Sequence, residues 1–168
     1  MTKTTTSFQP LATALVLALA CVSLARADDA ADCRKADGQL LEGKVAAKPA
    51  FKHGKFIKGV ELSHTHIRLV ADSDGKAYDV AIDNVFANGY QKNSKTVPAP
   101  LNTINVGDRI AACGQPFAGG IHWVHTNCGD APSTSHPDGW IKKVQPDGSL
   151  GPNLESNQTY CRLWGNGR

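Results

Sequence analysis

Histidine and tryptophan side chains gather in one stretch of the sequence, residues 119–141. It reads GGIHWVHTNCGDAPSTSHPDGWI and holds three of the six histidines and two of the three tryptophans. Imidazole nitrogens can bind a metal ion or transfer protons, and indole rings can stack against a ligand. The stretch, joined by one upstream histidine, is therefore the first place to look for a site. The candidate ligand-binding residues are His64, His122, Trp123, His125, His136 and Trp140.

A divalent metal ion such as zinc is one occupant that these residues could hold. Several imidazoles and a nearby carboxylate form a donor set that zinc accepts, with a position left open for water. The candidate metal ligands are His64, His122, His125, His136 and Asp130. The local spacing is not a ready-made metal pair, because alternation along a strand places His122 on the opposite face from Trp123 and His125.

A structural role is the alternative for the same residues. Trp123 and Trp140 would then be core aromatics, with Trp123 facing the core beside Ile121. His125 and His136 would hydrogen-bond the long loop between them, whose backbone groups need partners.

The first 27 residues have the pattern of a secretory signal peptide. Lys3 precedes an apolar run over residues 11–24, and Ala25-Arg26-Ala27 supplies small residues for cleavage. The prediction is a periplasmic or secreted protein without a transmembrane segment in the mature chain. Cys21 follows a poor lipoprotein box, so a form anchored through Cys21 is the minor alternative.

The remaining chain, residues 28–168, is long enough for one domain and nearly neutral in charge. Removing Lys3 and Arg26 leaves 16 basic against 15 acidic residues, a net charge of +1. This balance lacks the excess of basic residues that is typical of nucleic-acid-binding proteins. We expect a monomer whose ligand or partner is neutral or weakly charged.

Four cysteines remain after the signal peptide, and they predict two disulfides. An even number in an exported chain is typical of structural bridges. The three connectivities cannot be separated by spacing, and no C-x-x-C pair indicates a redox site. The disulfide cysteines are Cys33, Cys113, Cys128 and Cys161.

A hairpin is the clearest local structure. Residues 64–70 and 78–83 each alternate with period two around the turn sequence DSDG. The register that gives one apolar face pairs residue 69 with 78, 67 with 80, and 65 with 82. The other face then sets Arg68 beside Asp79 and His64 beside Asp83. Those polar residues are either solvated charge pairs, or His64, His66 and Asp83 line one end of a site.

Further short strands are expected at residues 40–47, 140–144 and 159–164. Residues 109–114 should pair with residues 120–125 in a second hairpin. Short strands with Gly and Pro turns predict an all-β barrel or sandwich. The expected organisation is a loose N-terminal segment at 28–39, a barrel domain at 40–144, and a C-terminal extension at 145–168 tied by Cys161.

The stretch resembles the core of a family of small exported bacterial domains, domain-of-unknown-function family 3465. The family pattern is like G-G-x-I-H-W-T-H-H-D-P, a gap, then H-x-x-G-W-I; here residues 119–125 read GGIHWVH and residues 136–141 read HPDGWI. His64 and the turn at residues 107–110 extend the match to about residues 43–144. The resemblance implies an exported, compact OB-like β-barrel and no established reaction.

This sequence departs from the family pattern after His125. Thr126-Asn127-Cys128 replaces the second H-D-P, so a paired histidine and an aspartate are missing. The loop before His136 is longer, and a bridge from Cys128 to Cys161 or Cys113 would be a local elaboration of it.

Three functions follow as expectations. The first is a non-enzymatic extracytoplasmic binding or accessory module whose His/Trp loop contacts a glycan or another weakly charged molecule. The second is a metal-dependent hydrolase that uses His64, His122, His125 and His136, with Asp130 or Asp138 as base. The third is a purely structural envelope or secreted protein.

Overall fold

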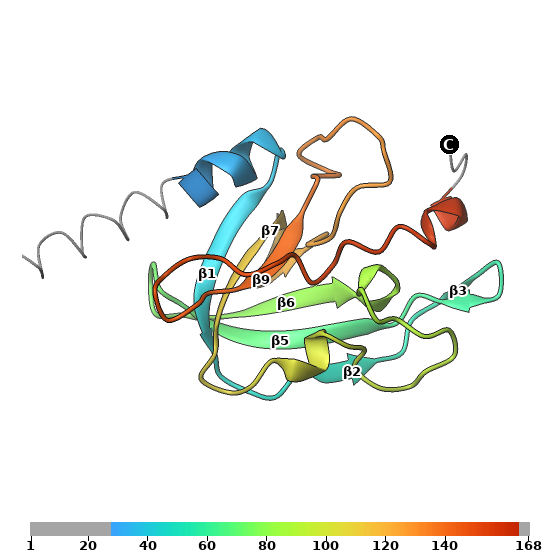
Figure 1. Ribbon diagram of the computed structural model, residues 1–168, viewed down its shortest axis with the longest axis horizontal. Coiled ribbons are helices and arrows are strands. Elements are labelled where there is room, and N and C mark those ends of the chain that lie inside the picture. Colours follow the sequence, from blue (N-terminus) through green and yellow to red (C-terminus); the bar gives the residue numbers. More distant parts are fainter. Residues whose placement is uncertain (1–27, 165–168) are drawn as a thin grey trace, which may run out of the picture.

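The computed structural model describes residues 28–164, which fold around a closed five-stranded β-barrel (Figure 1). The barrel strands are β1 (Gln39–Val45), β5 (His64–Ala71), β6 (Ala77–Asp83), β7 (Arg109–Phe117) and β8 (Gly120–His122). Strand β1 pairs with β5, β5 with β6, β6 with β8, β8 with β7, and β7 returns to β1. Only the β6–β8 pairing is parallel among these. This closed order is that of a small OB-like barrel, so the predicted fold class is confirmed.

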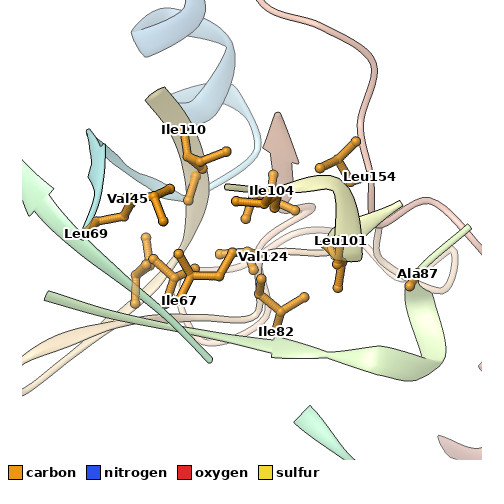
Figure 2. Close-up of a cluster of buried hydrophobic side chains, with 14 residues drawn as sticks. Val45, Ile67, Leu69, Ile82, Ala87, Leu101, Ile104, Ile110, Val124 and Leu154 are labelled. Carbon is orange, nitrogen blue, oxygen red and sulfur yellow. The ribbon is translucent and has the colours of Figure 1, made fainter. Parts of the chain in front are cut away.

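The core forms because apolar residues alternate along the strands and point inward. The predicted hairpin register is confirmed, with Leu69 opposite Tyr78, Ile67 opposite Val80, and Thr65 opposite Ile82. Strand β5 alternates between buried and partly exposed residues along most of its length. Figure 2 shows the buried aliphatic side chains of the strands and loops meeting inside the barrel. Each fully buried aliphatic side chain contributes about 1.5–3 kcal/mol relative to an exposed one.

The second hairpin differs from its prediction. Strand β7 continues to Phe117 and pairs with β8 through Gln115–His122, Pro116–Ile121 and Phe117–Gly120. The first half of β7 cannot pair with β8, because β1 and β9 (Trp140–Lys143) occupy its two edges. The turn of the hairpin is therefore residues 118–119 rather than the wider loop expected.

The N-terminal segment is more ordered than predicted. Residues 28–35 are helical rather than loose. Cys33 is fully buried in this segment and forms a disulfide with Cys113 of β7. The bridge and the small apolar cluster around it hold the helix against the barrel (Figure 1). The predicted signal peptide and Cys21 lie outside the described residues.

The C-terminal extension packs on the barrel and does not end in a strand. Residues 161–164 form a 3-10 helix, η3 (Cys161–Trp164), where a final strand was predicted. Leu154 enters the main core, and Leu163 packs in a second cluster with Val60 and Phe86. Cys161 pairs with Cys128, so the two predicted disulfides are confirmed and their pairing is fixed.

The remaining short elements lie in the connections between barrel strands. Strand β2 (Ala50–Lys52) pairs with the start of β5, and β3 (Phe56–Ile57) and β4 (Val60–Glu61) form a separate hairpin. The 3-10 helix η1 (Asn84–Phe86) directly follows β6, and η2 (Leu101–Thr103) precedes β7. Within residues 28–164 no helix is long and apolar enough to cross a membrane.

Candidate functional site

A cavity of about 780 Å³ opens at the end of the barrel where β5 begins and β6 ends. We call it the Asp83 cavity. Its walls come from the barrel, from η1, and from the chain that follows β8. The lining residues that matter for its chemistry are His64, Asp83, Phe86, Trp123, His125 and His136.

A backbone bend after β8 turns Trp123 toward this cavity. Trp123 has a φ angle of 55°, in the left-handed region that non-glycine residues rarely adopt. The bend breaks the alternation, so Val124 is buried in the core beside Ile67 and Ile82 (Figure 2). The expectation that Trp123 faces the core is therefore wrong. Gly114 of β7 makes the bend possible, since a Cβ there would lie 2.3 Å from the carbonyl oxygen of His122.

Asp83 is the charged centre of the cavity, with a histidine on each side of its carboxylate. His64 Nε2 lies 2.6 Å from Asp83 Oδ1, and His125 Nε2 lies 3.6 Å from Asp83 Oδ2. The hydrogen bond to Asp83 raises the pKa of His64 above its ordinary value. Burial would raise the pKa of Asp83, but the hydrogen bond from His64 and the His64 charge lower it overall. Asp83 is thus held as a carboxylate.

His125 is fixed as a nearly inaccessible acceptor. Its Nδ1–H donates to the carbonyl oxygen of Thr126 at 3.0 Å, and its ring stacks on Phe86 with centroids 3.7 Å apart. Burial lowers its pKa, so the neutral imidazole is favoured. With Nδ1 protonated, Nε2 carries a lone pair. This Nε2 atom is buried and has no hydrogen-bond partner among the described residues.

Glu155 is a second buried carboxyl group, contributed by the C-terminal segment. Its side chain is fully buried, and neither carboxyl oxygen has a hydrogen-bond partner within the described part of the chain. Burial, with a smaller contribution from the Asp83 charge, raises its pKa well above the ordinary value. The two carboxyl groups are therefore shifted in opposite directions: the pKa of Asp83 is lowered and the pKa of Glu155 is raised.

The loop between β8 and β9 is braced at several points; we call residues 126–139 the site loop. The backbone N–H of Asn127 donates to Asp138 Oδ1 at 2.7 Å, and its side-chain amide donates to the carbonyl of His136 at 3.1 Å. The Cys128–Cys161 disulfide ties the loop to the C-terminal segment. The His136 ring packs edge-on against Trp123 at 4.7 Å. The loop thus closes one wall of the cavity.

The structure brings together only part of the residue set expected from the sequence. His64, Trp123, His125, His136 and Asp130 all line the cavity. His122 does not line it and packs edge-on against Phe117. Trp140 lies elsewhere, buried near the Cys33–Cys113 bridge.

Sequence reasoning missed Phe86 and Glu155 and placed Asp83 only as one alternative. Phe86 lies in η1 directly after β6, and Glu155 lies in the extension outside the family-like region. No local sequence pattern identifies a side chain that reaches the site from a distant segment of the chain. The pairing of residue 64 with residue 83 in the hairpin register was the one signal that pointed to Asp83.

The expected metal centre is not assembled. His64 and His125 both lie beside Asp83, but residues 28–164 contain no group of three His, Cys, Asp or Glu side chains that could hold a metal ion. His136 instead contacts Trp123 and Ser135, and Asp83 rather than Asp130 is the carboxylate nearest the histidines.

Comparison with known proteins assigns no family to this site. No protein-family model matches the chain, and no curated protein matches it by sequence. The resemblance to family 3465 stays a prediction.

Proposed function

We propose that this protein is an extracytoplasmic binding module and that the Asp83 cavity takes a small carbohydrate-like ligand. The observation that carries the proposal is the pairing of a held carboxylate, Asp83, with aromatic walls in one cavity. Aromatic rings stack on the apolar faces of a sugar ring, while carboxylate and imidazole groups hydrogen-bond its hydroxyls.

The size and lining of the cavity support a small ligand. Its volume of about 780 Å³ falls within the range of small-molecule sites. Phe86 and Trp123 supply apolar surface, and His64, Asp83 and His125 add polar side chains to the same lining. This mixture of apolar wall and few placed polar groups is typical of ligand pockets.

The charge of the lining supports a ligand that is not an anion. The formally charged side chains around the cavity are Lys55, Asp83 and Asp130, one cationic and two anionic. An anionic polymer would meet a carboxylate at the centre and gain little from the rest of the nearly neutral chain.

The disulfides support export. Two bridges hold the N-terminal helix and the site loop, and such bridges persist in oxidising compartments outside the cytoplasm.

Calorimetric titration with a panel of neutral di- and trisaccharides tests the proposal, with a short oligonucleotide as the charged comparison. We expect a saccharide to bind and the oligonucleotide not to bind. Asp83→Asn and Trp123→Ala should each weaken binding about tenfold, the loss of one good hydrogen bond or aromatic contact.

The matched control is Asp79→Asn. Asp79 accepts a hydrogen bond from His66 at 2.8 Å on the same two strands, but neither residue lines the cavity. Equal losses from Asp79→Asn and Asp83→Asn would contradict the proposal, as would a panel in which no saccharide binds.

A further inference from the structure

Two acceptor atoms, His125 Nε2 and Asp83 Oδ2, face each other in the Asp83 cavity, and His125 Nε2 is buried without a hydrogen-bond partner among the described residues. His125 Nε2 and Asp83 Oδ2 are 3.6 Å apart, too far for a good hydrogen bond. In the neutral ring that burial favours, the Nδ1–H bond to the Thr126 carbonyl leaves the lone pair of His125 on Nε2. The ring cannot turn to escape this arrangement, because it is stacked on Phe86 and is 2% exposed.

An unpartnered acceptor of this kind costs free energy. A buried polar atom without a hydrogen bond is destabilising, and a lone pair beside a carboxylate adds repulsion. His64 binds the other oxygen of Asp83, so it does not satisfy Oδ2 through the same bond. A cationic donor group placed beside both atoms would satisfy them together.

The surroundings favour an organic cation over a metal ion. A metal would need more donors than these two, and His64, the other histidine beside Asp83, is already bonded to Oδ1. Residues 28–164 contain no group of three His, Cys, Asp or Glu side chains that could hold a metal ion. Aromatic rings stand there instead: Trp123 lies 5.0 Å from the His125 ring, and Phe86 covers its face. Aromatic faces attract ammonium groups through their negative quadrupole and do not ligate divalent metals.

We propose that Asp83 Oδ2 and His125 Nε2 recognise a primary ammonium group, and that the ligand of the cavity is an amine-bearing saccharide. This inference rests on the proposed carbohydrate-binding function and names its ligand class. The Asp83 carboxylate supplies the charge, His125 supplies the second acceptor, and Trp123 supplies an aromatic face. The rest of the cavity accommodates the sugar ring.

A matched pair of ligands tests the inference on the mature chain. The β-1,4-linked glucosamine disaccharide and its N,N′-diacetyl form share one skeleton and differ in the ammonium groups. In calorimetric titrations we expect the amine form to bind at least about tenfold more tightly, the effect of one charge-assisted hydrogen bond.

Two variants locate the effect. Asp83→Asn should remove the preference for the amine, and His125→Phe should reduce it while keeping a ring stacked on Phe86. Asp79→Asn should leave it unchanged. Thermal melts of each variant show whether the fold is retained, and His125→Phe keeps the test valid if Asp83→Asn does not fold.

Each other outcome overturns the inference. Equal binding of both disaccharides would refute recognition of the ammonium group but would leave the proposed carbohydrate-binding function in place. Binding of neither disaccharide would overturn the inference, and failure of the whole neutral panel would also overturn the proposed function. Zinc binding that is lost in both Asp83→Asn and His125→Phe would identify the occupant as a metal ion instead.

Discussion

Asp83 and Asp79 show how environment separates two similar residues. Both lie on β6, and each hydrogen-bonds a histidine on β5. Asp83 sits at the strand end, where η1, the site loop and the C-terminal segment close around it, and its side chain is 21% exposed. Asp79 is 39% exposed and lies outside the cavity. The same chemical pair is therefore a surface contact at one position and the centre of a cavity at the other.

Asp83→Asn should lower the pKa of His64 toward its ordinary value of 6.5, because the raised pKa depends first on the hydrogen bond to Asp83. The paired charges stabilise the fold most between the ordinary pKa values of aspartate, 3.8, and histidine, 6.5. That contribution is lost as pH rises through the raised pKa of His64. NMR titration of the His64 ring and urea unfolding across this range measure both effects. An unchanged His64 titration in the variant would show that the hydrogen bond to Asp83 does not raise the pKa of His64.

Glu155→Gln should stabilise the protein increasingly as pH rises. The buried carboxyl has a raised pKa in the folded state, so the unfolded chain ionises first above about pH 4.5. The wild-type protein then loses about 1.4 kcal/mol per pH unit until the folded pKa is reached. Urea unfolding from pH 4 to pH 8 should show curves that meet at acid pH and separate above it. Parallel curves would show that the pKa of Glu155 is not raised in the folded protein.

At the scale of elements, the alternating strands β5 and β6 were predicted correctly, whereas the bend in the chain after β8 was not predicted. The β5–β6 register follows from period-two patterning that only one pairing satisfies. The bend at Trp123 has no such signal, because it depends on Gly114 of another strand making room. For the same reason, spacing alone could not show that Val124 rather than Trp123 belongs to the core.

The second disulfide should control the site loop more than the barrel. Cys128 and Cys161 are 33 residues apart and join the loop to the C-terminal segment. The double variant Cys128→Ser/Cys161→Ser should lose about 2–4 kcal/mol of stability. Its loss of hydrogen-exchange protection should concentrate in residues 126–139, and ligand affinity should fall.

The matched control is Cys33→Ser/Cys113→Ser. This bridge joins the N-terminal helix to β7, away from the cavity lining. Its removal should reduce stability without loosening the site loop. If both double variants weaken ligand binding equally, the loop has no special role in holding the cavity.

At the scale of the whole molecule, an OB-like barrel provides a rigid base and the segments beyond it build the site. The barrel supplies His64 and Asp83 at one end, whereas Phe86, His125 and Glu155 come from the connections and the tail. The C-terminal segment runs back along the barrel and ends beside that region (Figure 1). The all-β class could be predicted because it depends on strand patterning, and the OB-like barrel was what the family resemblance implied. The cavity could not be predicted, since it needs segments that meet only after folding.

The NMR signals of the tryptophan indole groups during a saccharide titration test the central claim most directly. Trp123 lines the Asp83 cavity, whereas Trp140 is buried beside the Cys33–Cys113 bridge. A ligand that occupies the cavity should shift the Trp123 indole signal together with the backbone amides of Phe86 and His125. The Trp140 signal should stay in place. Binding that shifts Trp140 or other surfaces and leaves Trp123 unmoved would contradict the assignment of the Asp83 cavity as the ligand site.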